Sequence, residues 1–295
     1  MGHAVSVAGA KNAAQQTFRM SPPWVADVPW AQMLSHPVTR SVSLAALAVA
    51  SGAVISDLLT TGDRSILEIT LGAALGVEIF LGILAFSGAA LAPEGTWERL
   101  GLRPGRLSAA QTLLLIAGTL GASMALDGLL DLTTLKESSA LGEFEEHIAG
   151  VRGRTLWLSA LAFGVAPGLA EELLCRGLLQ RGLVRRLGAP AGILVASVAF
   201  GALHVDPVHA VFAAPLGLYL GIVSYLAGGI RGSIACHAAN NLVALGTGAF
   251  FPDLDAGGLR AVGGGGVIAL GALWLVWRRV GWPPHGGPPV PDRWE

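Results

Sequence analysis

Charged and polar side chains interrupt apolar stretches at three places in the second half of the chain. The first is residues 170–176, where Glu171 and Glu172 are followed by Arg176. Adjacent carboxylates point about 100° apart on a helix, whereas Arg176, four residues after Glu172, lies on the same face. We therefore expect Arg176 to pair with Glu172, which leaves Glu171 available for chemistry. The alternative is that these three charges mark the end of a span at the membrane surface.

The other two places each contain a histidine. His204 closes the apolar run 200–204, and His237 is followed by Asn241, with Asn240 as a near alternative on the same helix face. A neutral imidazole and a carboxylate can together activate a water, either directly or by holding a metal. An asparagine amide can donate a hydrogen bond to a developing oxyanion. Two histidines and a glutamate on three neighbouring helices thus indicate a hydrolytic site, although a single buried histidine usually serves packing.

Other polar residues in the apolar segments receive weaker predictions. His209 follows Asp206-Pro207 and is expected to begin the next helix rather than to join the site. Glu78 and Asp127 each offer a partner for a buried donor, and their sequence context assigns neither a task.

The composition predicts that these residues lie inside a membrane. Of the 295 residues, 53% are hydrophobic and 13% are charged, whereas soluble domains carry about 25% charged residues. The 41 glycines favour close helix packing in a bilayer. Cys175 and Cys236 are expected to be buried thiols without a disulfide framework. A net charge of −1 and the lack of a Lys/Arg block argue against nucleic-acid binding.

Apolar stretches long enough to cross about 30 Å of hydrocarbon predict an all-α polytopic protein with about eight transmembrane helices. No apolar run follows the start directly, so a cleaved signal peptide is not expected. The predicted spans are 41–60, 66–91, 107–130, 155–175, 189–204, 208–228, 232–251 and 261–280.

The distribution of positive charge predicts the orientation. With eight spans, fourteen of the 19 Lys and Arg residues fall on the side of the two termini. Cytoplasmic loops carry the excess of positive charge, so both termini are expected in the cytoplasm. High Ala, Gly and Arg usage suggests a multi-pass protein of a bacterial inner membrane. The five residues on the other side are Arg64, Lys136, Arg152, Arg154 and Arg260.

The chain divides into three predicted parts. Residues 1–40 form a cytoplasmic N-terminal segment, 41–281 a single transmembrane domain, and 282–295 a Pro- and Gly-rich disordered tail. Within the domain, the acidic segment 131–154 is expected to be a solvated loop rather than an amphipathic surface helix.

The three groups of polar residues resemble the motifs of a known family. Glu171-Glu172-x-x-x-Arg176, Phe200-x-x-x-His204 and His237-x-x-x-Asn241 are similar, in order and spacing, to the three motifs of the CPBP intramembrane proteases. This family, also called Abi, includes the CAAX prenyl endopeptidases and bacteriocin-processing or self-immunity proteins. The resemblance covers roughly residues 155–251. It implies hydrolysis of a peptide bond in a membrane-associated protein or peptide, near the cytoplasmic leaflet.

The resemblance also implies roles for the motif residues. Glu171 would be the general base, helped by His204, while Glu172 and Arg176 would hold the geometry. His237 and Asn241 would complete the site by binding a metal or stabilising the oxyanion, with Asn240 as the alternative to Asn241.

Whether a metal takes part stays open from the sequence. Members of the family are commonly labelled metalloproteases, and Zn²⁺ would suit Glu171, His204 and His237 as ligands. The zinc-protease motif His-Glu-x-x-His is absent, and water activation by Glu and His without a metal is equally workable.

Three competing functions share some of these features. A serine intramembrane protease of rhomboid type would use Ser233, four residues before His237. A proton-coupled transporter would also place carboxylates and histidines in its spans. A membrane scaffold or immunity protein would keep the motifs without proteolysis. For a bacterial protease, leader peptides or C-terminal membrane anchors are the expected substrates.

Overall fold

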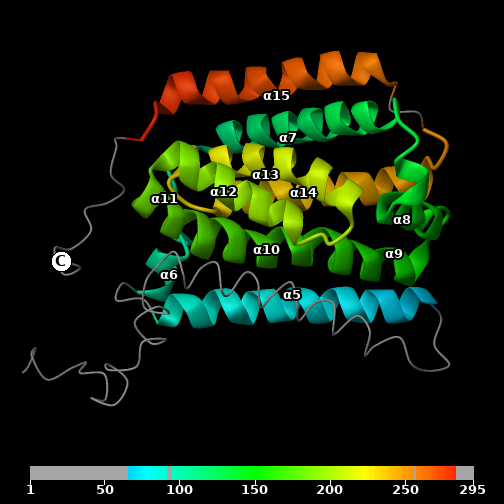
Figure 1. The fold of residues 1–295 in the computed structure, drawn as a ribbon, viewed down its shortest axis with the longest axis horizontal. Helices are drawn as coiled ribbons and strands as arrows, with labels where there is room; N and C mark the ends of the chain where they lie inside the picture. The colour runs from blue at the N-terminus through cyan, green and yellow to red at the C-terminus, as the bar shows by residue number, and fades with distance from the viewer. Residues whose placement is uncertain (1–65, 92–94, 255–256, 284–295) are drawn as a thin grey trace, which may run out of the picture.

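The computed structural model describes residues 66–91, 95–254 and 257–283, and this part of the chain is helical without a strand (Figure 1). The predicted span 41–60, the segment 1–40 and residues 284–295 of the predicted tail lie outside the described residues.

Five helices are long and apolar enough to cross a membrane, judged by length and composition. The large apolar side chains that these helices expose are suited to contact with lipid. The five helices are α5 (Ile66–Ala90), α7 (Ala109–Leu130), the continuous helix Gly153–Leu187, α13 (Pro207–Ala227) and α15 (Leu259–Val280).

Seven of the eight predicted spans coincide with helices, but two of them differ from an ordinary span. The helix α12 (Ala189–Ala202) has 14 residues, which is about 21 Å and too short to cross the hydrocarbon. The helix α14 (Arg231–Phe250) has 20 residues, but polar side chains interrupt its apolar surface. These two helices carry the histidine motifs. The helices that are too short or too polar for an ordinary span are therefore the ones that carry the candidate site residues.

The predicted span 155–175 is part of a helix of 35 residues. It comprises α9 (Gly153–Ser159), α10 (Ala166–Glu172) and α11 (Arg181–Leu187), joined by two π-helical segments, η2 (Ala160–Val165) and η3 (Leu173–Gln180). Pro167 at the start of α10 has no N–H to donate, and its ring would clash with the carbonyl four residues earlier. The π-helical turn before Pro167 accommodates that loss. The second one follows Glu171 and Glu172 directly, and π-helical turns often occur at functional sites.

The helices lie side by side in a bundle, with α5 along one side and α7 with α15 along the other (Figure 1). The helix α15 packs mainly on α7, and they meet closely at Gly121 and Gly265. A Cβ atom on Gly121 would lie 2.8 Å from the carbonyl oxygen of Gly265. Glycine at this crossing therefore lets two helices in a membrane approach backbone to backbone.

The acidic segment 131–154 is not the solvated loop that the sequence predicted. It contains η1 (Lys136–Ser138) and α8 (Ala140–Ile148). Ile148 is buried against Leu245 and Ala249 of α14, and the ring of Phe144 meets that of Phe163 edge to face at 5.1 Å. The apolar side chains on one face of α8 thus dock it on the bundle, which the predominance of glutamates in the sequence concealed.

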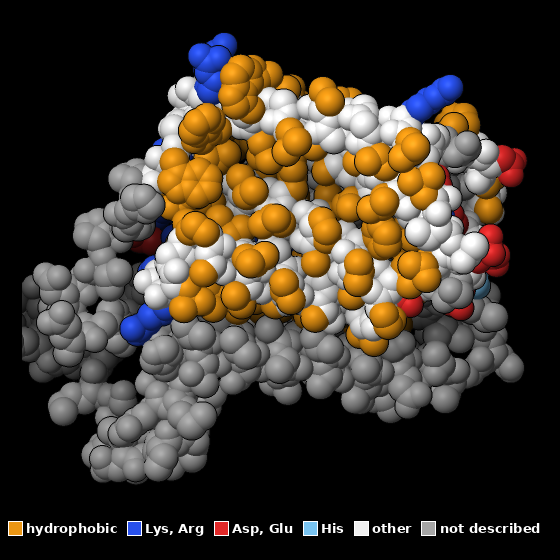
Figure 2. Space-filling view, turned by 45° about the horizontal axis from the view of Figure 1, so that its top comes forward, with side chains coloured by type: hydrophobic (Ala, Val, Ile, Leu, Met, Phe, Trp, Pro, Cys, Tyr) orange, Lys and Arg blue, Asp and Glu red, His pale blue; other side chains and the backbone are white. Residues whose placement is uncertain are grey.

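Charged side chains gather at the two ends of the helices, and hydrophobic ones cover the face between them (Figure 2). The short helix α6 (Thr96–Arg99), α11 and the C-terminal end of α15 lie at one end of the bundle, and α8 lies at the other (Figure 1). The first end is rich in arginine, as Arg103, Arg106, Arg185, Arg186, Arg231, Arg278 and Arg279 belong to these elements or to adjoining helix ends. This arrangement is that of a protein embedded in a bilayer.

Candidate functional site

The centre of the site is a buried network around Glu172. The side chain of Glu172 is fully buried, and its Oε1 accepts a hydrogen bond of 2.6 Å from Nη1 of Arg176. This is the ion pair that the four-residue spacing predicted. The same oxygen lies 3.1 Å from Nδ1 of His237 on α14. Because an ionised carboxylate only accepts, Nδ1 of His237 carries the proton and donates to Glu172.

Arg176 has further partners that the sequence did not indicate. Its Nη2 donates to the carbonyl oxygen of Gly217 on α13 at 2.8 Å. Its guanidinium carbon lies 4.2 Å from the centre of the Phe200 ring. That ring also meets His204 at 5.1 Å and His237 at 5.6 Å, both edge to face. Phe200 therefore holds the arginine and both histidines in place, a role that its apolar character in the sequence did not reveal.

Glu171 lies beside this network without joining it. Its Oε2 is 4.0 Å from Nε2 of His237, which is too long for a hydrogen bond, and this oxygen has no hydrogen-bond partner among the described residues. The side chain of Glu171 is 12% exposed, against 0% for Glu172. One carboxylate is thus committed to the fold, and its neighbour is slightly exposed as a side chain but keeps a buried oxygen without a protein partner among the described residues.

A second carboxyl group lies on α5 near Glu171. Glu78 is buried, its Oε2 has no hydrogen-bond partner among the described residues, and it interacts electrostatically with Glu171. Three residues after Glu78, Leu81 on the same face of α5 belongs to one apolar cluster with Ala170 and Leu174. The sequence assigned Glu78 no task, because nothing in its surroundings shows which face α5 turns towards α10.

His204 stands in the turn after α12, and its orientation is fixed. Its Nδ1 lies 3.0 Å from the carbonyl oxygen of Phe200, so Nδ1 carries the proton and Nε2 is the basic nitrogen of the neutral ring. The next residue, Val205, has φ of 60°, a strained conformation for a β-branched residue. Val205 is 66% exposed, so the turn lies at the surface of the described part of the protein, next to the partly buried ring of His204.

His209 lies closer to the site than the sequence predicted. As expected, it falls in the first turn of α13, where its backbone N–H donates to the capping Asp206 side chain at 2.7 Å. Its ring centre, however, is 4.2 Å from that of His204. The tight turn between α12 and α13 brings the two rings into contact, so His209 packs against His204.

The remaining predicted residues lie on α14. Asn240 is buried, and its Nδ2 donates to Oδ1 of the less buried Asn241 at 3.4 Å. The choice between them as oxyanion donor stays open. Ser233, the serine of the rhomboid alternative, is buried and donates to the carbonyl of Ile230 in its own helix at 3.0 Å.

The predicted zinc ligands do not form a ready site. Among the described residues, no three side chains of His, Cys, Asp or Glu are grouped so that they could hold a metal ion. Nδ1 of both histidines is engaged, which leaves Nε2 of each ring for a water or a metal ion. Oε2 of Glu171 lies 4.0 Å from Nε2 of His237, so a water held directly by these side chains is one arrangement that the site allows.

The cysteines are buried and free, as predicted. Cys175 packs against Phe200 and Ala213, and Cys236 lies in the cluster with Leu115 and Tyr219. Neither has a disulfide partner in the described part of the chain.

Close approach of α10 and α14 at Gly168 makes the network possible. A Cβ on Gly168 would lie 2.8 Å from the backbone nitrogen of Ala238, the residue after His237. We expect Gly168→Ala to force the helices apart, weaken the contact between His237 and Glu172, and cost about 1–3 kcal/mol. The midpoint of thermal unfolding in detergent measures this loss. Gly246→Ala on α14 is the matched control, since a Cβ there meets nothing within 4 Å; equal midpoints for the two variants would contradict the prediction.

Comparison with known families adds an independent observation. Residues 153–243 match the family model described as type II CAAX prenyl endopeptidase Rce1-like. This region of the chain is similar to the Rce1-like family. The match confirms the family that the three motifs predicted. Neither the comparison with curated proteins nor that with solved structures found a match.

The Rce1-like region runs from the start of α9 into α14 and contains every predicted site residue. Since this is a family of proteases, the comparison supports a protease embedded in the membrane. Glu78 and the helices α5, α7 and α15 lie outside the region. The helices α5, α7 and α15 thus pack around the region that is similar to the Rce1-like family.

Proposed function

We propose that the chain is an intramembrane endopeptidase of the CPBP type, which cleaves a membrane-associated protein or peptide with a water activated by Glu171 and His204. The observation that carries the proposal is the contrast between the two adjacent carboxylates. Arg176 and His237 hold Glu172 in place, while the buried Oε2 of Glu171 lacks a protein partner in the described residues. Such an oxygen in an apolar helix is costly unless it is used.

The proposed reaction begins with the water beside Glu171. The oxygen of this water attacks the carbonyl carbon of the scissile bond, and one of its hydrogens passes as a proton to the Glu171 carboxylate. Its other hydrogen is donated in a hydrogen bond to Nε2 of His204. Asn241, or Asn240, donates to the oxyanion of the tetrahedral intermediate. When the intermediate collapses, the C–N bond breaks and the leaving nitrogen receives the proton from Glu171.

His237 has a different part in this proposal. Its proton on Nδ1 is committed to Glu172, so it turns Nε2 towards Glu171. Before the substrate binds, a water between Nε2 of His237 and Oε2 of Glu171 could donate one hydrogen to each; when it attacks, the hydrogen on the His237 side turns to Nε2 of His204. His237 therefore orients the water, and Glu172 and Arg176 fix the tautomer and position of His237.

The proposal extends to the membrane in which the protein lies and to its substrates. The arginine-rich end of the bundle supports a cytoplasmic position for that end, and we place the protein in a bacterial inner membrane. Leader peptides and C-terminal membrane anchors of exported proteins fit a site inside the bilayer. Comparing the membrane peptides of cells with and without the protein, by mass spectrometry, tests this: cleaved products should vanish without it, and identical peptide sets would count against proteolysis.

A chelation experiment tests the role of metal. Because the side chains suit direct activation of water, we expect peptide cleavage by the purified protein to survive exhaustive chelation. Elemental analysis should then find far less than one zinc per chain. Loss of cleavage on chelation, restored by added Zn²⁺ but not Mg²⁺, would show instead that Glu171, His204 and His237 assemble around a metal.

A further inference from the structure

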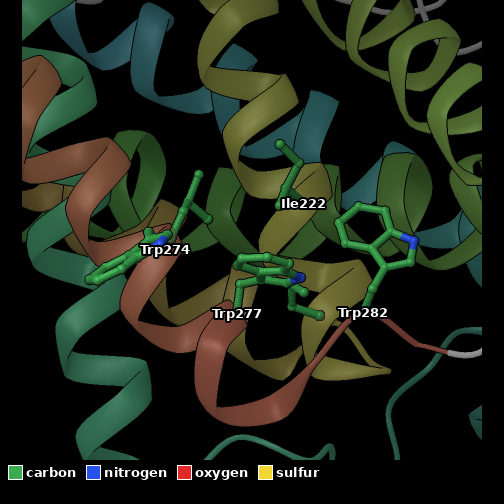
Figure 3. A pocket seen from close by; sticks show the side chains of 6 residues that line it. Ile222, Trp274, Trp277 and Trp282 are labelled. Atoms are coloured by element: carbon green, nitrogen blue, oxygen red, sulfur yellow. The ribbon is translucent and has the colours of Figure 1, made fainter.

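An apolar pocket of about 410 Å³ lies between α13 and α15, away from the candidate site (Figure 3). Ile222 enters it from α13, Trp274 and Trp277 come from α15, and Trp282 follows the end of that helix. Leu226 and Leu273 complete the lining. The pocket exists because α15 packs along α7 and contacts α13 only slightly.

Three arginines, Arg106, Arg278 and Arg279, lie near one end of this pocket. Nη2 of Arg106 donates to the carbonyl oxygen of Leu226 at 2.7 Å, and its Nη1 donates to that of Val280 at 3.4 Å. Arg106 thus bridges the ends of α13 and α15 next to the pocket while staying exposed. The guanidinium carbon of Arg278 lies 4.8 Å from the centre of the Trp274 ring, and the exposed Arg279 follows it.

These positive charges have no acidic partner in the described part of the chain. Within the described residues, Arg106, Arg278 and Arg279 form no ion pair with a carboxylate. The ring of Tyr225 adds a polar tip at the same end, where it lies 4.8 Å from the Trp282 ring. Tryptophan, tyrosine and arginine together are typical of the level of the lipid headgroups.

We propose that this groove binds one anionic phospholipid. Its acyl chain lies against the tryptophans and Ile222, and its phosphate lies among Arg106, Arg278 and Arg279. Charge complementarity favours this occupant, because a basic pocket between transmembrane helices suits an acidic headgroup, and the apolar slot has the volume of a small-ligand site. The lipid fills the gap between α13 and α15, and it does so whether or not the protein is a protease.

Native mass spectrometry of the full chain in detergent tests the charge contribution. With equal amounts of phosphatidylglycerol and phosphatidylcholine carrying the same acyl chains, we expect one retained phosphatidylglycerol and little phosphatidylcholine. The double variant Arg278→Gln/Arg279→Gln should weaken phosphatidylglycerol binding by about tenfold or more. Arg103→Gln/Arg186→Gln is the matched control, since it removes two exposed arginines from the same end of the bundle, and it should bind as the wild type does.

A second variant tests the slot with the arginines intact. Ile222→Trp should fill the groove, and it should lower both lipid retention and the quenching of tryptophan fluorescence by phosphatidylglycerol with brominated chains. Equal binding of the two lipids, or equal losses in the two double-arginine variants, would overturn the proposal. So would phosphatidylglycerol binding that appears only after residues 284–295 are removed, because the chain's own tail would then be the occupant.

Discussion

Replacing Glu171 with glutamine should lower peptide cleavage by at least about a hundredfold, since a positioned general base contributes about 10²–10⁴ in rate. Glutamine keeps the size of the side chain but cannot accept a proton from water. The fold should survive, because Oε2 of Glu171 has no protein partner in the described residues that the change would break. The membrane peptides of cells carrying the variant, and cleavage by the purified protein, both measure the effect.

Two further substitutions sharpen this experiment. Glu171→Asp keeps a carboxylate but withdraws it by one methylene, so activity should fall between that of the wild type and that of Glu171→Gln. Glu146→Gln, an exposed glutamate of α8, controls for loss of a carboxylate elsewhere and should leave cleavage unchanged. Full cleavage by a folded Glu171→Gln protein would remove Glu171 as the base.

Replacing Arg176 with leucine should prevent most of the protein from folding. Glu172 is fully buried, and breaking a buried ion pair by removing one partner costs about 3–5 kcal/mol. The change also removes the donor to Gly217 and the contact with the Phe200 ring. The yield of monodisperse protein in detergent and the midpoint of thermal unfolding should both fall sharply.

The compensating double variant separates charge from shape. In Arg176→Leu/Glu172→Leu no charge is left unpaired, so part of the lost stability should return. Activity should not return with it, because His237 loses the acceptor that orients its ring. Arg186→Leu, which replaces an exposed arginine of the same long helix, should behave as the wild type does. An Arg176→Leu protein with normal yield and unfolding midpoint would show that the ion pair does not hold the fold together.

Local spacing and composition account for what the sequence predicted well. The pairing of Glu172 with Arg176 follows from a four-residue separation on one helix, whatever surrounds it. The helical membrane fold follows from an excess of apolar residues that only a bilayer can solvate. The order of the three motifs indicated the CPBP intramembrane proteases, and the match of residues 153–243 to the Rce1-like family model agrees with that prediction.

The sequence was least informative where a turn or a short helix changes direction. It predicted a short span for 189–204, and α12 ends at Ala202 and leaves His204 in the turn before α13. It set His209 apart from the site because a proline precedes it, yet that turn brings the two rings together. Hydrophobic patterns predict that a helix exists better than they predict where it stops.

By itself, therefore, the sequence determined which residues carry charge inside the spans, and which carboxylate its neighbour on the same helix would neutralise. Only the tertiary structure decided that His237, 65 residues away, shares the oxygen of Glu172 with Arg176. It also decided that Glu78 lies near Glu171, and that Arg106 and Arg278, from two distant segments, lie next to one apolar groove. These contacts depend on how each helix is rotated and how closely it packs, as at Gly168. Rotation and packing distance are properties of helix pairs, which spacing along a single helix does not encode.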